Sequence, residues 1–469
     1  MKKFLNIKSL FAILLSVLLT SCITQKKYER PANIVDDKLY RTDMLQSDST
    51  GLGDLSWKEI FTDATLQQHI SEALENNLDI RMALQNIISA EAYLKQSKSA
   101  YFPTVSVGSG YTFNTPSLNT QSAQAFAERR YINSFDLSGD ISWEADIWGK
   151  LSAQERSQMA SYLGTVAAHK TVKSDIIAAI ASAYYQLLTY DEQKRIISET
   201  INIRKKNLET TKALKDAGTL TEVAVQQSEA LVHNAESLLI NIDTQIELLE
   251  NAISLLKGKP STKIERTTLS QQKVPNNTDL GFSARLLANR SDVMAAEYNL
   301  MNSFELTNVA KASFYPNLRI TGSTGILSGD IDQLFSVNSL FATVIGSITQ
   351  PVLNKRQIKT QYEVSLANQE RAYLNFRKTI LTAGKEVSDA LKVYTAQDKF
   401  ISLKEKELTN YQKSVEYSQQ LVNYGMANYL EVLNASVNQL NAELNISNAR
   451  LAKMQAGVEL YRALGGGWK

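Results

Sequence analysis

The 469-residue chain contains a single cysteine, Cys22, and three scattered histidines, His69, His169 and His233. One cysteine excludes a disulfide framework and a Cys-x-x-Cys metal site. The histidines lack the spacing of metal ligands, so we expect them on helix surfaces and expect neither a metal site nor a cofactor. A P-loop, a dinucleotide-binding fingerprint and a Gly-x-Ser-x-Gly nucleophile motif are also missing. These absences predict a protein that is not an enzyme.

The first 22 residues have the pattern of a secretory signal. A positive segment with Lys2, Lys3 and Lys8 precedes an apolar run that is too short to span a bilayer as a helix. The run ends in Leu-Thr-Ser-Cys22, which resembles a bacterial lipobox, whose cysteine is lipidated and becomes the mature N-terminus. We therefore expect residues 1–21 to be a lipoprotein signal peptide and residues 22–60 a lipidated N-terminal linker. An ordinary signal peptide with a chance cysteine is the alternative.

An excess of charge of either sign is missing from the mature chain. Removal of residues 1–21 takes away three lysines and no acid, so 50 Lys and Arg become 47 against 48 Asp and Glu, a net charge of about −1. A nucleic-acid-binding protein would carry a basic surplus. The composition therefore predicts no nucleic-acid partner.

Proline and glycine are nearly absent from two long stretches, residues 149–217 and 352–424, in which Gly164 and Gly384 are the internal glycines. At 1.5 Å per residue, a helix of this length is a rod of roughly 100 Å. Apolar residues recur at alternating spacings of three and four in both stretches, which indicates packing against other long helices. The first seam is Ile176, Ile180, Ala183, Leu187, Tyr190, Ile197, Ile201 and Leu208, and the second is Ile380, Ala383, Val387, Ala390 and Tyr394.

Polar residues interrupt these seams, for example Lys194, Arg204, Gln397 and Lys404. A two-stranded coiled coil would avoid them, so the pattern favours a wide helical tube with a wet interior. Each stretch ends at a glycine, Gly218 or Gly425, which is a C-cap signal. Partner helices over 222–257 and 429–463 then complete two hairpins, 149–257 and 352–463.

The chain is internally duplicated. Asp79 to Ala83 and Tyr101-Phe102-Pro103 reappear about 213 positions later as Asp292 to Ala296 and Phe314-Tyr315-Pro316. A repeat of this length indicates two similar structural halves rather than a solenoid. We expect a first structural repeat over 61–260, a linker over 261–277 and a second structural repeat over 278–469.

Four candidate strands lie between the helices, at about 104–113, 135–147, 317–325 and 340–349. The second alternates apolar Phe135, Leu137, Ile141, Trp143, Ala145 and Ile147 with polar residues. Such alternation suits a transmembrane β-strand of about 9 to 11 residues or a soluble sheet with one wet face. Known membrane barrels need at least about eight strands, so four can enter lipid only in a barrel shared between chains. The loops 114–133 and 326–338 would then face the exterior.

The collinear motifs resemble those of the TolC-like outer-membrane factor family, within it the outer-membrane lipoproteins of RND efflux systems. The motifs are Trp57 to Asp63, Ala73 to Arg81, Trp143 to Lys150, Gln350 to Val352, Tyr424 to Leu433 and Ala463 to Trp468. The resemblance implies a mainly α fold with a transmembrane β-barrel portion. Long helical hairpins form a periplasmic α-barrel, four strands per chain build a 12-stranded barrel shared by a homotrimer, and residues 261–277 join an equatorial belt.

The resemblance also implies a function and a location. The chain would be a passive exit duct in the outer membrane, anchored by lipid, that carries drugs and other toxic small molecules to the exterior. Its partners would be a periplasmic adaptor protein and an inner-membrane RND-type pump. Within channels, a duct for secreted protein or for metal ions is the alternative. From another class, a structural coiled-coil surface lipoprotein with a small soluble β domain is the rival.

Two sets of site residues follow from the resemblance. In relatives, acidic residues past the second tip glycine constrict the closed tunnel; Glu431 occupies one such position and Asn434 fills the other, a departure from the pattern. Three copies of Glu431 would form a carboxylate ring that selects cations. The alternative is that Glu431 is a solvated helix residue. Contact with the adaptor is assigned to the helical tips, Gly218, Thr219, Leu220, Gly425, Met426 and Ala427.

Overall fold

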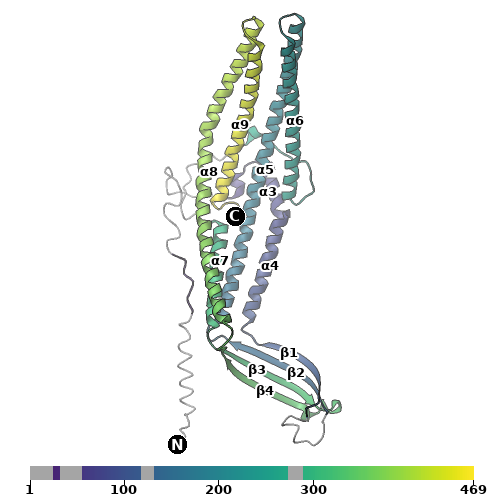
Figure 1. Cartoon of the computed structure of the whole chain (residues 1–469), viewed down its shortest axis with the longest axis vertical. Coiled ribbons are helices and arrows are strands. Elements are labelled where there is room, and N and C mark those ends of the chain that lie inside the picture. The colour runs from purple at the N-terminus through teal and green to yellow at the C-terminus, as the bar shows by residue number, and fades with distance from the viewer. Residues whose placement is uncertain (1–24, 32–54, 118–130, 273–288, 469) are drawn as a thin grey trace. The chain divides into compact units, whose positions relative to one another are not determined.

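The computed structural model describes residues 25–31, 55–117, 131–272 and 289–468. Its first half contains α2 (Trp57–Ile60), α3 (Ala64–Asn76), α4 (Leu78–Ser99), β1 (Thr104–Asn114), β2 (Ile132–Ala145), α5 (Lys150–Asp216), α6 (Glu222–Leu256) and the 3₁₀ turn η3 (Leu269–Gln271). Its second half contains α7 (Ser291–Ala312), β3 (Asn317–Ser328), the turns η5 (Ile331–Gln333) and η6 (Val337–Ser339), β4 (Leu340–Thr349), α8 (Gln357–Asn423) and α9 (Tyr429–Ala463). Figure 1 shows these elements.

The predicted duplication is confirmed element by element. The helices α4 and α7 each have 22 residues, α5 and α8 each have 67, and α6 and α9 each have 35. Each half therefore consists of a helix, a strand pair and a long helical hairpin. The mainly helical fold with four strands agrees with the sequence-based prediction.

The chain divides into two compact units, and each repeat contributes to both. We call the first the strand unit; it comprises residues 1–30, 88–164 and 297–375 as far as they are described, and it contains all four strands. The second is the helical unit, with residues 31–87, 165–296 and 376–469. Cys22, residues 1–21, most of the 22–60 linker and residues 273–277 lie outside the described part of the chain.

The core of the helical unit is built from the predicted seams. Of the first seam, Ile176, Ile180, Leu187 and Ile197 are buried, and all five residues of the second seam are buried. Short helices near the N-terminus add to this core, with Leu66 and Ile70 of α3 inaccessible to solvent. Burying side chains of this kind stabilises a fold by about 1.5 to 3 kcal/mol each. The heptad pattern thus corresponds to real packing between α5, α8 and their neighbours.

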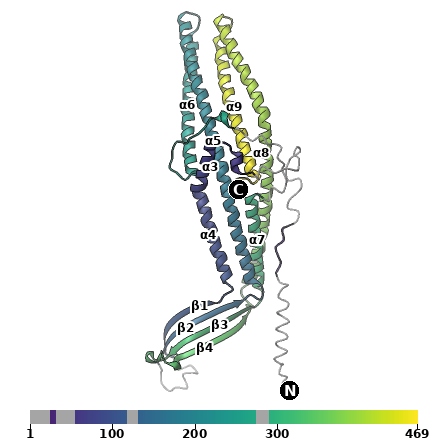
Figure 2. The ribbon, with the colours of Figure 1, turned by 180° about the vertical axis from the view of Figure 1, so that it is seen from behind.

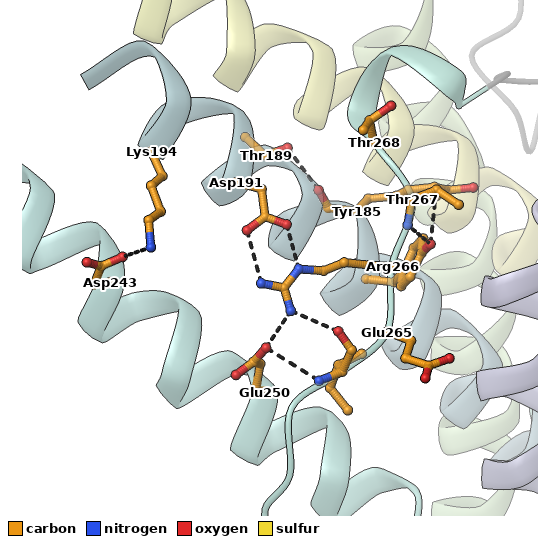
Figure 3. Close-up of polar contacts among 12 residues, drawn as sticks. Tyr185, Thr189, Asp191, Lys194, Asp243, Glu250, Glu265, Arg266, Thr267 and Thr268 are labelled. Carbon is orange, nitrogen blue, oxygen red and sulfur yellow. Dashed lines mark hydrogen bonds and ion pairs between the residues drawn. The ribbon is translucent and has the colours of Figure 1, made fainter. Parts of the chain in front are cut away.

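A partly buried ionic cluster joins the segment after α6 to the helices (Figure 3). The Arg266 guanidinium donates to both carboxylate oxygens of Asp191 in α5 and to Glu250 in α6. Beside it, the Asp63 carboxylate accepts hydrogen bonds from Tyr184 at 3.0 Å and Thr267 at 2.6 Å. Burial alone would lower the pKa of Arg266, but the two carboxylates outweigh it and raise that pKa. These contacts fix the described part of the predicted linker against the helical unit.

One histidine differs from the surface position that we expected. His69 is 4% exposed; its Nε2 lies 2.7 Å from the Glu265 carbonyl oxygen and its Nδ1 lies 2.9 Å from Nζ of Lys257. Burial is the main cause of its lowered pKa. The prediction failed because His69 packs where α3 meets α6, a contact between segments that are far apart in the sequence. His233, in contrast, has an exposed side chain.

Candidate functional site

The four strands form one antiparallel sheet in the order β1-β2-β3-β4. Its register places apolar residues opposite apolar ones: Val105 pairs with Ile141, Tyr111 with Phe135, and Trp143 with Ile320. Because side chains alternate along a strand, residues that pair across strands share a face. The sheet therefore has one mainly apolar face and one mainly polar face, and the latter also carries Leu327, Phe341 and Ile345.

Every charged residue within the four strands lies on the polar face. These residues are Asp136, Asp140 and Glu144 of β2 and Arg319 of β3, and Glu144 pairs directly with Arg319. Small polar residues and glycines fill much of the same face on β1. Opposite charges directly across a strand pair are mutually stabilising. The polar face is suited to contact with water.

The apolar face is open to the surroundings of the single chain. Val105 is 70% exposed, Val107 is 77% exposed and Val344 is 79% exposed. Tyr111 and Phe113 of β1 lie on the same face and are also exposed. An exposed apolar patch of this kind marks an interaction surface. In a sheet whose other face is polar, the apolar residues are suited to contact with lipid.

The second strand begins and ends earlier than predicted, at Ile132 and Ala145 rather than 135 and 147. Asp146, which we expected on its polar face, instead accepts hydrogen bonds from the backbone N–H groups of Leu151 and Ser152 at 2.8 and 2.9 Å. A carboxylate at this position satisfies free N–H groups at the start of α5 and complements the helix dipole. The alternation of apolar and polar residues extends beyond the end of β2 because Asp146, which caps α5, is itself polar.

The loops at the far end of the sheet are described in part. Residues 118–130 of the first predicted loop lie outside the described residues. In the second, β3 extends to Ser328, and the turns η5 and η6 then lead to β4. Phe335 and Val337 in this loop are each 82% exposed.

The two helical tips have the same construction. After α5, the N–H of Gly218 donates to the Lys215 carbonyl at 2.9 Å and the N–H of Thr219 donates to the Leu214 carbonyl at 2.9 Å. After α8, Gly425 and Met426 repeat both bonds at 3.0 and 2.8 Å. This pair of bonds is the Schellman motif. It requires a left-handed residue, and the φ angles of Gly218 and Gly425 are +74° and +70°.

In each tip, the residue three positions after the glycine caps the next helix. Thr221 accepts from the N–H of Ala224 and begins α6, and Asn428 accepts from the N–H of Leu430 and begins α9. Within the helical unit the tips lie side by side, as both views show (Figures 1 and 2). Tyr429, Val432 and Leu433 of α9 form a buried cluster on which Leu220 packs.

The predicted adaptor contacts occupy these tips with different exposure. Gly218, Thr219, Gly425 and Met426 are exposed, and Met426 is 76% exposed. Leu220 and Ala427 are half-buried. Leu220 therefore serves mainly to join the tips, and the other residues offer the more open surface.

The predicted gate residues lie on one exposed face of α9. Glu431 is in the first turn, and Asn434 follows one turn later; both side chains are exposed. Residues three apart on a helix are neighbours on its surface. The structure thus brings Glu431 and Asn434 together, next to the second tip, while Val432 and Leu433 face the interior.

No described helix combines the length and the apolar character that a bilayer-spanning helix needs. No group of three or more His, Cys, Asp and Glu side chains in the described part of the chain has an arrangement that could hold a metal ion.

An amphipathic four-stranded sheet and two long helical hairpins are the elements that the sequence predicts for an outer-membrane channel protein. The particular family follows from comparison with known sequences. The profile described as "Outer membrane efflux protein" matches residues 69–259 and 283–466, so the chain belongs to this family.

Relatives along the whole chain agree with this assignment. The chain is 27% identical to the solvent efflux pump outer membrane protein SrpC of Pseudomonas putida, over 88% of this chain and 87% of the relative. It is 25% identical to the probable outer membrane lipoprotein SilC of Salmonella typhimurium, with 99% of each covered. The fold is similar to that of the CmeC outer membrane channel of Campylobacter jejuni, with a TM-score of 0.84 at 22% identity, covering 95% of this chain and 94% of that one. The protein is the outer-membrane channel component of an efflux system.

Proposed function

We propose that the protein acts as a homotrimeric, passive exit duct for small toxic organic molecules, supplied by an RND-type pump through a periplasmic adaptor. The observation that carries the proposal is the four-stranded sheet with one apolar face. Its outer strands, β1 and β4, each have one edge without a partner within the described sheet. Open sheet edges are not tolerated in lipid, so further strands must come from other copies.

The number of copies follows from the size of the barrel. Two copies would supply eight strands, and the interior of an eight-stranded barrel is filled by side chains. Three copies supply twelve, which leaves space for a passage. The polar face of the sheet, with Asp136, Asp140 and Glu144, would line this passage, and Val105, Val107 and Val344 would face lipid.

Exposed apolar stripes on the helices support assembly in the helical unit too. Ile240, Leu248 and Leu255 recur at heptad-like spacing along α6 and are 57% to 71% exposed. Phe400 and Leu403 of α8 are 45% and 56% exposed. Neighbouring copies would bury these stripes against each other, which would close a helical tunnel of the kind that the polar interruptions of the seams favour.

The tips and the first turn of α9 would form the end of the tunnel that carries the gate and the adaptor contacts. Glu431 from three copies would form the carboxylate ring, with Asn434 as a ring of amides one turn further along. The exposed tip residues, Gly218 and Thr219 with Gly425 and Met426, would receive the adaptor, because small and apolar residues allow its helices to dock closely.

A lipid on Cys22 would add an anchor to the barrel. The described segment that begins three residues later packs on α7 within the strand unit. The Asn308 amide donates to the Lys26 carbonyl at 3.1 Å, and Arg30 forms an ion pair with Glu297 at 3.0 Å. The lipid and the membrane-facing sheet would then belong to one unit of the protein. The name of SilC, an outer membrane lipoprotein, agrees with this proposal.

The substrate class is proposed from SrpC, whose name assigns it to solvent efflux. Deletion of the gene should make its host more sensitive to organic solvents and apolar drugs, and the intact gene should restore resistance. Purified protein should also form discrete channels in planar lipid bilayers. A structural surface lipoprotein would give no channels, and unchanged sensitivity to every compound tested would contradict an efflux role.

A further inference from the structure

A buried arginine lies below the helical tips. Arg204 of α5 is 4% exposed, although arginine is among the residues that proteins almost never bury without a partner. Its Nη1 donates one hydrogen bond, to the Leu231 carbonyl oxygen of α6 at 2.7 Å. Its Nε is buried and has no hydrogen-bond partner among the described residues.

The positive charge of Arg204 also lacks a counter-charge within the described part of the chain. Two other arginines of the helical unit contact two carboxylates each: the partly exposed Arg266 contacts Asp191 and Glu250, and the buried Arg290 contacts Asp292 and Glu386. Arg204 forms no ion pair with any described residue, and burial lowers its pKa with no neighbouring charge to oppose the change. The guanidinium nevertheless stays protonated at neutral pH.

Arg204 lines a small cavity. The cavity has a volume of about 10 Å³, which is room for one occupant of about the size of a water molecule. Polar side chains from three helices line it, Arg204 and Asn207 of α5, Ser228 of α6, and Tyr429 and Ser436 of α9. The α9 residues in this lining, Tyr429 and Ser436, lie in the first two turns of that helix, so the cavity lies beside its N-terminal part.

We propose that this cavity is a binding site for a small inorganic anion, which is chloride in the cell. A single water could accept a hydrogen bond from Nε, but it would leave the buried charge uncompensated, which is costly. A phosphate group is too large for a cavity of about 10 Å³. Chloride matches its size after a small displacement of the lining side chains, and its negative charge complements that of Arg204.

The bound anion joins the two hairpins. Arg204 and Ser228 belong to the first hairpin, and Tyr429 and Ser436 belong to the second. Val432 and Leu433, which directly follow Glu431, complete the apolar wall of the cavity. Chloride therefore stabilises the packing of α9 against the first hairpin directly below the tips. The site stands independently of which molecules the channel exports.

Thermal unfolding of the purified full-length mature protein in detergent tests the proposal. The melting temperature should be higher in sodium chloride than in sodium gluconate at equal ionic strength, and it should rise with chloride concentration, because a ligand that binds the folded state stabilises it. Arg204→Met should abolish the difference. Arg195→Met is the matched control, because Arg195 is on the same helix but is half-exposed and paired with Glu192 and Glu199. That variant should keep the full chloride effect.

Bromide gives a direct test on the unaltered protein, which remains decisive if Arg204→Met does not fold. Crystals grown in sodium bromide should show an anomalous peak within hydrogen-bonding distance of Nε of Arg204. The absence of this peak, or a chloride effect of equal size in Arg204→Met, would overturn the proposal.

Discussion

The Arg266 guanidinium donates two hydrogen bonds to the Asp191 carboxylate, from Nε to Oδ2 at 2.5 Å and from Nη2 to Oδ1 at 3.0 Å. The two residues are 75 positions apart, and the pair joins the segment after α6 to the middle of α5. Planar, two-pronged pairs of this kind are the strongest hydrogen-bonded ion pairs in proteins. Glu250 completes the cluster from α6.

Arg266→Met should destabilise the helical unit by about 2 kcal/mol. Removing one partner from a fully buried ion pair costs about 3 to 5 kcal/mol, and the partial exposure of Asp191 reduces this loss. The measurement is the shift of the unfolding transition in detergent. Lys194→Met is the control, because it breaks the exposed Lys194 to Asp243 pair, which should contribute less than about 1 kcal/mol. Equal shifts in the two variants would contradict a structural role for the partly buried cluster.

Val344→Arg should prevent insertion of the sheet into the outer membrane. Val344 lies near the middle of β4 on the apolar face, where an arginine in a membrane barrel costs about 2 to 4 kcal/mol. Thr343→Arg is the matched control, since its side chain is on the polar face of the same strand. Membrane fractionation should find the first variant depleted and the second retained. Equal retention of both would indicate that the apolar face does not contact lipid.

Glu431→Ala should raise single-channel conductance or weaken the preference for cations. Three carboxylates in one ring attract cations and repel one another, so their removal relaxes both effects. Glu222→Ala is the control, because Glu222 is in the first turn of the other tip helix and is paired with Lys215 at 3.1 Å. Planar bilayer recordings with unchanged conductance and selectivity in Glu431→Ala would refute the gate assignment.

Leucine at both Gly218 and Gly425 should abolish efflux and leave the oligomer intact. A Cβ at either glycine meets no atom within 4 Å, so the added side chains would project from the tips and obstruct docking. The double alanine variant is the control. Alanine has the same cost of about 1 to 2 kcal/mol per residue for the left-handed backbone conformation as leucine, but it lacks the large side chain. Drug susceptibility should be normal with alanine and increased with leucine. Normal resistance in the leucine variant would exclude the tips as the docking surface.

Much of the fold could be predicted because its signals are local. Gly218 and Gly425 carry the conformation that ends a long helix, and the alternation around Phe135 follows from the pleat of β2. What could not be predicted depends on contacts between distant segments. Arg266 has no motif that points to Asp191.

The sequence also could not predict which single polar residues are buried. His69 was expected on a surface and lies in the core. Arg204 was recognised as an interruption of a seam, and we interpreted it as a sign of a wet tunnel. Only the structure reveals that the side chain is buried and lines a small cavity, and that its Nε has no hydrogen-bond partner among the described residues.

The account depends most on the barrel shared by three copies, and electron microscopy of the detergent-purified mature protein tests it most directly. We predict particles with three-fold symmetry in end-on views and a helical tube of roughly 100 Å. Single chains with a separate small β domain, or rods without rotational symmetry, would contradict the shared barrel and with it the proposed exit duct.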